Sequence, residues 1–254
     1  MELSTVLKKL DIQAVLFDLD DTLIATHAIF KAQVEQMMQV LVSLLVPGQA
    51  TGEQLWEDYN SALSIAIQTH NVVPELLWRS VLRQLQESYP AIGEDTKEAC
   101  LSTLMDIYEQ VPVLFGNVIE ILSDLKSAGI KVAVVTHAAP EWTEFKLEQT
   151  GILPFIDHVQ IAPTGENKDW RCWYNASWLL GVPSEHCLAV GDSLRGDVEA
   201  ALMARIGEVM LMRRTDGWDF VSQGDVPEGV TVIGSLGEIP ANLIEKYNLE
   251  LKLR

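Results

Sequence analysis

The sequence predicts an α/β fold, in which helices cover both faces of a parallel β-sheet and a helical unit is inserted after the first strand. Short runs of apolar, strand-forming residues alternate with helical stretches along most of the chain. Two of these runs end in aspartates, as expected when a buried strand delivers acid groups to its carboxyl end. One long interval after the first run carries helical periodicity alone.

The first strand is expected at residues 13–17, directly before a cluster of aspartates. Runs of the same composition follow at residues 130–137, 157–163, 186–193 and 207–212. Helical stretches between them close on Gly129 and Gly181, because a helix C-terminus favours glycine just beyond its last turn. The last segment predicts one more short strand and a helix that begins near Leu236.

The inserted unit is predicted to contain four amphipathic helices and no strand. They are expected at residues 26–46, 51–67, 74–89 and 96–109. A capping box between Thr51 and Gln54 indicates where the second helix begins. Pro74, which suits the first turn of a helix, indicates where the third helix begins. The domains expected are therefore a core of residues 1–25 and 112–254 and a helical domain of residues 26–111, joined near 24–27 and 111–117.

The composition excludes several classes of protein. The chain has 18 Lys and Arg against 36 Asp and Glu, a net charge of −18, so we expect no nucleic-acid partner. The longest apolar run, residues 40–46, is too short to span a bilayer, and the N-terminus lacks the layout of a signal peptide. Three distant cysteines indicate a reducing compartment. We expect a cytoplasmic protein, monomer or homodimer, with no membrane partner.

Two carboxylate clusters follow predicted strands. Asp18, Asp20 and Asp21 end the first strand, and Asp192 and Asp197 follow another. In a parallel sheet both strand ends open on the edge where ligands bind. So many buried charges are costly unless a cation lies among them, and hard oxygen ligands suit Mg²⁺. Mg²⁺ is therefore the expected cofactor.

The same residue types suit phosphoryl transfer. Asp18 can attack phosphorus and form an aspartyl-phosphate, and Asp20 can protonate the leaving oxygen and then activate water. Thr136, at the end of the second predicted strand, and Lys168, in the loop after the third, would hold the transferring oxygens.

These residues lie in four motifs that resemble those of the haloacid dehalogenase (HAD) superfamily, in the family's order. The motifs are FDLDDTL at 17–23, VVTH at 134–137, Lys168 and VGDSLRGD at 190–197. The resemblance spans nearly the whole chain. It implies a Rossmann-like HAD core, and the helical insertion resembles a cap of the C1 type.

The resemblance implies roles for the four aspartates. Asp18 is the nucleophile and Asp20 the general acid and base. Mg²⁺ is bound by Asp18, the backbone carbonyl of Asp20 and Asp192, with Asp197 as a further ligand or anchor. The superfamily's founding dehalogenases lack an acid at the Asp20 position and its phosphonate-cleaving members replace it, so Asp20 argues for cleavage of a P–O bond.

The resemblance also assigns Thr136 and Lys168 to phosphoryl binding, with two departures from the family pattern. His137 stands where many relatives carry Asn, and it can still donate a hydrogen bond to phosphate or substrate. Lys168 is followed by Asp169 where Pro is frequent, which adds a carboxylate beside the cation.

We therefore expect a Mg²⁺-dependent phosphatase for a small phosphomonoester metabolite, such as a sugar phosphate, phosphoglycolate or a nucleoside monophosphate, with the cap closing over the substrate. A phosphomutase is the alternative enzyme. A non-catalytic binding module is a further alternative, and Asp20 disfavours a dehalogenase.

Two other features have a structural interpretation. His27, at the entry to the cap, is expected on the surface. Four aromatic residues recur on one helical face and are expected to pack in the core. They are Trp170, Trp173, Tyr174 and Trp178.

Overall fold

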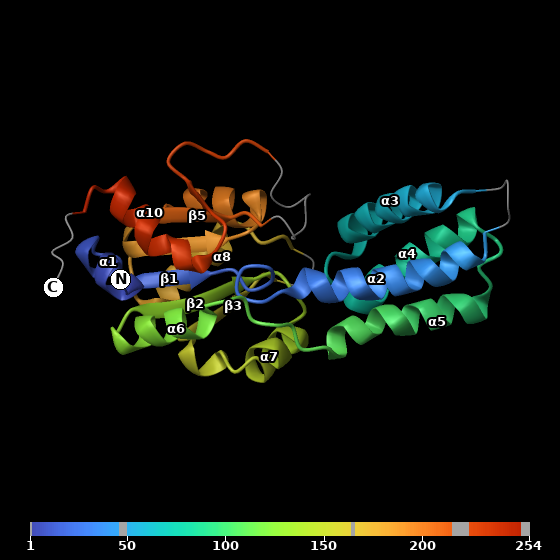
Figure 1. Cartoon of the computed structure of the whole chain (residues 1–254), viewed down its shortest axis with the longest axis horizontal. Coiled ribbons are helices and arrows are strands. Elements are labelled where there is room, and N and C mark those ends of the chain that lie inside the picture. The colour runs from blue at the N-terminus through green and yellow to red at the C-terminus, as the bar shows by residue number, and fades with distance from the viewer. Residues whose placement is uncertain (1, 46–49, 164–165, 215–223, 250–254) are drawn as a thin grey trace.

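The computed structural model describes residues 2–45, 50–163, 166–214 and 224–249. A sheet with its covering helices forms one part of the molecule, and a bundle of helices lies beside it (Figure 1). The bundle is inserted between the first and second strands of the sheet. The first helix, α1 (Leu3–Lys9), and the last, α10 (Ile239–Lys246), both lie on the sheet part, away from the bundle (Figure 1).

All six strands of the sheet are parallel, in the order β3-β2-β1-β4-β5-β6. Their bounds are β1 (Ala14–Phe17), β2 (Lys131–Thr136), β3 (His158–Ile161), β4 (Cys187–Gly191), β5 (Glu208–Met212) and β6 (Thr231–Ile233). Phe17, the last residue of β1, lies opposite Val134 on one side and Val190 on the other. The loops after β1, β2 and β4 therefore leave the sheet at one edge.

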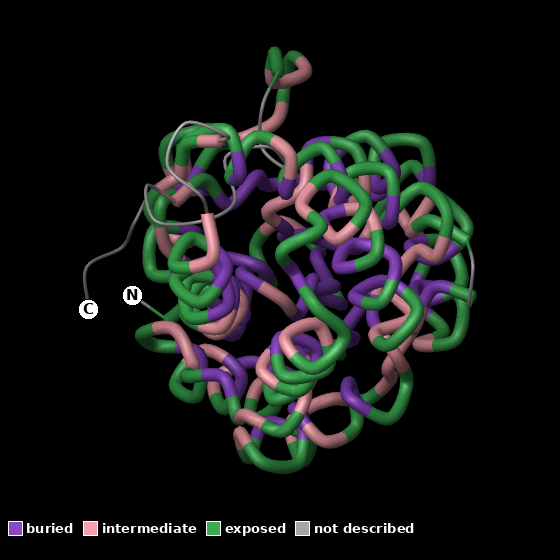
Figure 2. The backbone as a smooth tube through the Cα atoms, turned by 90° about the vertical axis from the view of Figure 1, so that its right-hand side faces the viewer, coloured by how far each residue is buried: buried purple, intermediate pink, exposed green. Residues whose placement is uncertain are grey.

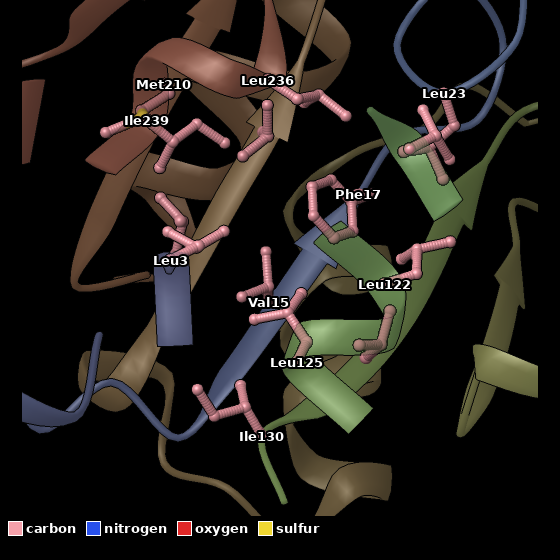
Figure 3. Packing of buried hydrophobic residues seen from close by; sticks show 14 of the residues in the cluster. Leu3, Val15, Phe17, Leu23, Leu122, Leu125, Ile130, Met210, Leu236 and Ile239 are labelled. Atoms are coloured by element: carbon pink, nitrogen blue, oxygen red, sulfur yellow. The ribbon is translucent and has the colours of Figure 1, made fainter. Parts of the chain in front are cut away.

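Alternate residues of β1 face two different hydrophobic clusters, which explains why the whole strand is apolar. Val15 and Phe17 belong to the cluster beneath α1 (Leu3–Lys9), α6 (Val118–Ser127) and α10 (Ile239–Lys246) (Figure 3). Ala14 and Leu16 belong to the cluster beneath α8 (Trp170–Leu180) and α9 (Ala200–Met203). The predicted parallel sheet with helices on both faces is confirmed.

The helical bundle has its own hydrophobic cluster. Its helices are α2 (Thr26–Ser43), α3 (Gly52–His70), α4 (Pro74–Ser88) and α5 (Glu94–Met105), followed by a 3₁₀ turn, η1 (Asp106–Glu109). Buried residues from all four helices meet in this cluster, together with Ala138 and Trp142 from the segment after β2. In Figure 2 the buried parts of the backbone lie mainly inside the molecule and the exposed parts around its outside. Leu55, Trp78, Leu82 and Leu104 are among its least exposed members.

Local sequence signals explain where several helices begin. The Thr51 hydroxyl accepts a hydrogen bond from the Gln54 N–H at 3.1 Å, which is one half of the predicted capping box. Pro74 occupies the first turn of α4. The fourth helix begins at Glu94 instead of residue 96, and its last turn is 3₁₀. Residue 46, where the first helix was expected to end, lies outside the described residues.

Two chain segments join the bundle to the sheet side by side. Ile24 forms an antiparallel bridge with Leu114, and the Ala25 N–H donates a hydrogen bond to the Val113 carbonyl at 2.8 Å. The N–H of Phe115 donates to the Leu23 carbonyl at 3.0 Å. These paired linkers place both connections directly beside the loop that follows β1.

The aromatic helix face is only partly in the core. Trp173 is fully buried, but 41% of Trp170, 47% of Tyr174 and 67% of Trp178 is exposed, so the expectation of a core face was wrong for these three. The sheet side of α8 is formed by Trp173 together with small residues such as Cys172 and Ala176.

Cys100, Cys172 and Cys187 are free and buried, as small hydrophobic residues usually are. Within the part of the chain that the structure describes, no helix has both the length and the apolar composition needed to cross a bilayer.

Candidate active site

Three of the predicted aspartates meet at the carboxyl edge of the sheet. Asp18 directly follows β1 and Asp192 directly follows β4, while Asp197 lies in a π-helical turn, η4 (Leu194–Glu199). One carboxylate oxygen from each lies within 4.8 Å of the others. The parallel register of β1 and β4 explains this meeting, because the Asp18 N–H continues the ladder by donating to the Val190 carbonyl at 2.9 Å.

Gly191 makes room for Asp197. A Cβ atom on Gly191 would stand 2.3 Å from Asp197 Oδ2, far inside van der Waals contact. The same Oδ2 accepts a hydrogen bond from the Ser193 N–H at 2.8 Å, which fixes the carboxylate against the turn. The Ser193 hydroxyl in turn accepts from the Gly196 N–H at 3.1 Å. The segment after β4 is therefore built to hold Asp197 against the strand end.

Lys168 is the cation of the cluster. Its Nζ contacts Asp18 Oδ1, lies 2.5 Å from Asp197 Oδ1 and donates to the Val135 carbonyl at 3.1 Å. The two carboxylates raise the pKa of the ammonium against the opposing effect of its burial, so Lys168 stays charged.

Asp169 does not compete for this lysine. Its carboxylate caps α8 by accepting from the Arg171 N–H at 2.9 Å, and it also pairs with the Arg171 guanidinium. Asp169, which stands where the family often has Pro, therefore serves as the N-cap of α8.

The aspartates carry more negative charge than Lys168 balances. Burial is the main cause that raises the pKa of Asp18 to about 7, and the neighbouring Asp197 and Asp20 add to it. Burial and the charge of Asp18 also raise the pKa of Asp192 well above its ordinary value. Asp18 Oδ2 is buried without a hydrogen-bond partner among the described residues. A divalent cation fits this donor set, because it would supply the missing positive charge and accept oxygen ligands.

Thr136 and His137 lie at the same edge, at the end of β2. The Thr136 hydroxyl and His137 Nε2 are buried and have no hydrogen-bond partner among the described residues. Burial and the nearby Lys168 lower the pKa of His137, so its ring is neutral near pH 7. Both residues line the same cavity as Asp18 and Lys168. All seven residues predicted for the site are therefore close together.

Asp20 is held apart from the other acids by two donors. The Thr26 hydroxyl donates to Asp20 Oδ1 at 2.5 Å, and Lys146 Nζ lies 2.5 Å from Oδ1 and 2.7 Å from Oδ2. The Asp20 side chain is 25% exposed, whereas that of Lys146 is fully buried. Asp20 therefore has its own cation, separate from Lys168.

Lys146 lies outside all of the motifs that the sequence predicts for the site. It lies on α7 (Pro140–Gln149), and its Nζ stands 3.7 Å from the centroid of the Trp142 ring, one helical turn earlier. The helical spacing of the sequence could have indicated that Lys146 is buried, because it shares one face of α7 with other buried residues. These are Trp142, Thr143 and Leu147. A lysine on such a face needs a buried anion, and Asp20 supplies it.

His27 was expected on the surface, and this expectation was wrong. It is 9% exposed, its N–H donates to Asp21 Oδ1 at 3.0 Å, and its Nδ1 lies 2.6 Å from the same oxygen. Asp21 has a left-handed backbone conformation with φ of 63°. The two contacts with His27 therefore fix the turn that carries Asp20 into place.

A cavity of about 440 Å³ joins these groups to the helical bundle. Its sheet end is lined by Asp18, Thr136, Lys168 and Asp192. Its other end is lined by apolar and aromatic side chains from α2, α3, α4 and η1. The arrangement can therefore bind a small anionic group at the sheet edge and enclose the group attached to it.

Comparison with known proteins identifies the family. A family model described as haloacid dehalogenase-like hydrolase matches residues 12–205, more than half of the chain. The chain therefore belongs to this family of hydrolases, as the four motifs indicate.

The curated relatives that are similar to the chain include two kinds of phosphatase besides a putative pyrophosphatase of Clostridium perfringens, which is 26% identical over 72% of this chain and 76% of its own length. Glyceraldehyde 3-phosphate phosphatase of Methanopyrus kandleri is 26% identical over 80% of this chain and 84% of its own length. N-acylneuraminate-9-phosphatase of Homo sapiens is 21% identical over 91% of this chain and 94% of its own length.

Solved structures share the fold. A haloacid dehalogenase-like hydrolase from Xanthomonas campestris superposes with a TM-score of 0.73 at 17% identity, covering 92% of this chain and 91% of its own. An L-2-haloacid dehalogenase from Xanthobacter autotrophicus gives a TM-score of 0.61 at 16% identity, covering 92% and 98%.

Gly191→Ala is expected to displace Asp197 and to lower the free energy of unfolding by about 1–3 kcal/mol, as overpacking does. Urea unfolding measures this change. Gly116→Ala is the control, because a Cβ atom there meets nothing within 4 Å, and its effect should stay below about 0.5 kcal/mol. Equal effects of the two substitutions would contradict the close approach of Asp197.

The charge of Asp18 predicts how stability depends on pH in metal-free protein. The folded state keeps the Asp18 proton up to about pH 7, whereas the unfolded chain releases it near 3.8. Between these values the folded state binds more protons, so the contribution of Asp18 to the free energy of unfolding falls as pH rises.

Asp18→Asn removes this contribution. In the presence of a chelator, the stability of Asp18→Asn relative to wild type should increase from pH 4 to pH 7, on the order of 1–4 kcal/mol. Urea unfolding across this pH range measures the difference in stability between the two proteins. Mg²⁺ should reduce this difference at pH 7, because it binds and stabilises the wild type. A difference that is independent of pH would contradict the raised pKa of Asp18.

Proposed function

We propose that the chain is a Mg²⁺-dependent phosphatase that hydrolyses a small phosphomonoester through an aspartyl-phosphate on Asp18. The observation that carries this proposal is the separate support of two carboxylates, Asp18 by Lys168 and Asp20 by Thr26 and Lys146. One carboxylate is placed to serve as nucleophile, and the second, two residues later, is held to exchange protons.

The reaction has two steps. An Asp18 oxygen bonds to phosphorus while the P–O bond of the ester breaks, and Asp20 gives its proton to the leaving oxygen. Asp20 then takes a proton from water, whose oxygen attacks phosphorus and releases phosphate from Asp18. The proton returned to Asp20 restores the starting state, so the two steps balance.

Mg²⁺ would be held by Asp18, Asp192 and the backbone carbonyl of Asp20, with Asp197 as a further ligand or as an anchor for Lys168. When bound, it neutralises charge on the phosphoryl group and on the aspartates. The raised pKa values of Asp18 and Asp192 and the unpartnered Asp18 Oδ2 support this assignment.

The phosphoryl oxygens would be bound by Lys168, Thr136 and His137. The unpartnered Thr136 hydroxyl and His137 Nε2 are buried polar groups that a phosphate would satisfy. Lys168 bridges Asp18 and Asp197, so its charge lies where negative charge develops during transfer.

The helical unit, residues 26–111, would act as a cap that excludes water from the site. The Asn71 side-chain amide, at the end of α3, donates to the Glu166 carbonyl in the loop before Lys168, at 2.9 Å. This hydrogen bond links the helical unit to the loop that carries Lys168.

The curated relatives support the phosphatase reading, since two of them are named as phosphatases of phosphorylated metabolites. The dehalogenases among the similar structures share the fold. An acid at the Asp20 position disfavours dehalogenation, as the family resemblance implies. The free, buried cysteines suit the cytoplasm, where we expect the enzyme to act.

Phosphate release from p-nitrophenyl phosphate tests this function. Wild type should require Mg²⁺, and Asp18→Asn should lose at least about 100-fold in kcat because the nucleophile is gone. A wild type that is inactive with Mg²⁺ on this ester and on a panel of metabolite phosphates would overturn the proposal. Transfer of phosphate to a sugar instead of water would favour a phosphomutase.

Lys146→Met tests the support of Asp20, since it keeps the apolar stem and removes the charge. For glycerol 3-phosphate, a poor leaving group that needs a proton, kcat/KM should fall about 100-fold. For p-nitrophenyl phosphate the fall should be at most a few-fold, because this leaving group departs without a proton. Lys131→Met is the control, since the Lys131 side chain is exposed and pairs with Asp157. An equal loss on both esters would indicate a purely structural lysine.

A further inference from the structure

We propose that the physiological substrate is a phosphomonoester of an aromatic or otherwise largely apolar alcohol, an inference that rests on the phosphatase function proposed above. It departs from the sugar phosphates and other polar esters that the sequence suggests. The observation behind it is the apolar wall of the cavity, formed by Phe30, Leu63, Leu77, Trp78, Tyr108 and Trp142.

The apolar wall is dominated by aromatic rings that pack on one another. The Phe30 ring lies 6.1 Å from Trp78, 6.2 Å from Tyr108 and 5.9 Å from Trp142, between ring centroids. Tyr108 and Trp142 meet edge to face at 4.8 Å. These separations are those of favourable aromatic pairs, so a ligand ring or hydrocarbon chain against this wall would extend the same packing.

Several polar groups on the cap side of the cavity are already used within the protein, whereas Asn71 Oδ1 and Trp142 Nε1 are buried without a hydrogen-bond partner among the described residues. The Trp78 indole N–H donates to the Tyr108 hydroxyl at 3.1 Å. The Asn71 amide donates to Glu166, and the Thr26 hydroxyl donates to Asp20. Burial raises the pKa values of Tyr59 and Tyr108, so both hydroxyls stay neutral.

No charged side chain from residues 26–45 or 50–111 lines the cavity among the described residues. A sugar or polyol would bring several hydroxyls that lose water on entry, and these hydroxyls would outnumber the two unpartnered atoms, Asn71 Oδ1 and Trp142 Nε1. Each such hydroxyl costs binding free energy, whereas an apolar group gains it. The cap side therefore selects against polyols.

The two ends of the cavity define the shape of the ligand. Lys168, Thr136 and His137 offer anion binding at the sheet end, and the apolar wall lies at the cap end. The volume of about 440 Å³ is within the range of small-molecule sites. The ligand is therefore an amphiphile with one phosphate and a compact hydrocarbon body.

A series of primary alkyl esters tests the inference, because similar leaving groups separate binding from chemical reactivity. The series is 2-phenylethyl phosphate, hexyl phosphate, glycerol 3-phosphate, glyceraldehyde 3-phosphate and glucose 6-phosphate. The first two should give kcat/KM values at least about tenfold above the other three, mainly through a lower KM.

Two variants on one helix provide the matched comparison. Leu63→Asn places an amide in the apolar wall and should reduce the preference for 2-phenylethyl over glycerol phosphate by about tenfold. Ile65→Asn, two residues away on α3 and 50% exposed, should leave the preference unchanged. Thermal unfolding of both variants checks that each is folded.

The possible results distinguish failure of the apolar-substrate proposal from failure of the proposed phosphatase function. Hydrolysis of the polar esters at equal or higher kcat/KM would overturn the apolar substrate and leave the phosphatase intact. A preference for the apolar esters that Leu63→Asn leaves unchanged would also overturn it, because the apolar wall would then not be the cause. No release from any ester, p-nitrophenyl phosphate included, would overturn both.

Discussion

The site depends on one electrostatic constraint, the gathering of aspartates around a single buried lysine at the carboxyl edge of the sheet. Lys168 bridges Asp18 and Asp197, and the remaining negative charge raises the pKa values of Asp18 and Asp192. Such a cluster is unfavourable in isolation and becomes favourable when an external cation binds among the carboxylates. The neighbouring structure holds these charges together. Gly191, which has no side chain, leaves room for Asp197, and the Ser193 N–H donates a hydrogen bond to the Asp197 carboxylate.

The second cation, Lys146, connects this charged edge to the aromatic end of the cavity. Its ammonium pairs with Asp20 and lies over the Trp142 ring, which itself packs on Phe30 and Tyr108. The carboxylate proposed to move protons therefore shares a lysine with the apolar wall proposed to bind the substrate.

Much of the fold could be predicted because its signals are local. The apolar strands, the glycines that close helices and the helical periodicity of the insertion each appear within a few residues, and the sheet follows from their alternation. The exposure of Trp170, Tyr174 and Trp178 could not be predicted, because helical spacing shows which residues share a face but not how far the neighbouring sheet covers it. His27 was misplaced for a similar reason, since its partner Asp21 reaches it only through a left-handed turn.

By itself the sequence determined that Asp18, Asp192, Thr136 and Lys168 belong to one site, because carboxyl ends of parallel strands meet at one edge. Only the tertiary structure decided that Lys146 pairs with Asp20, 126 residues away, since that contact depends on how α7 packs beside the sheet. It also decided that the cap presents an aromatic wall to the cavity. Helix packing sets which side chains of four amphipathic helices turn inward together, and no local pattern contains that information.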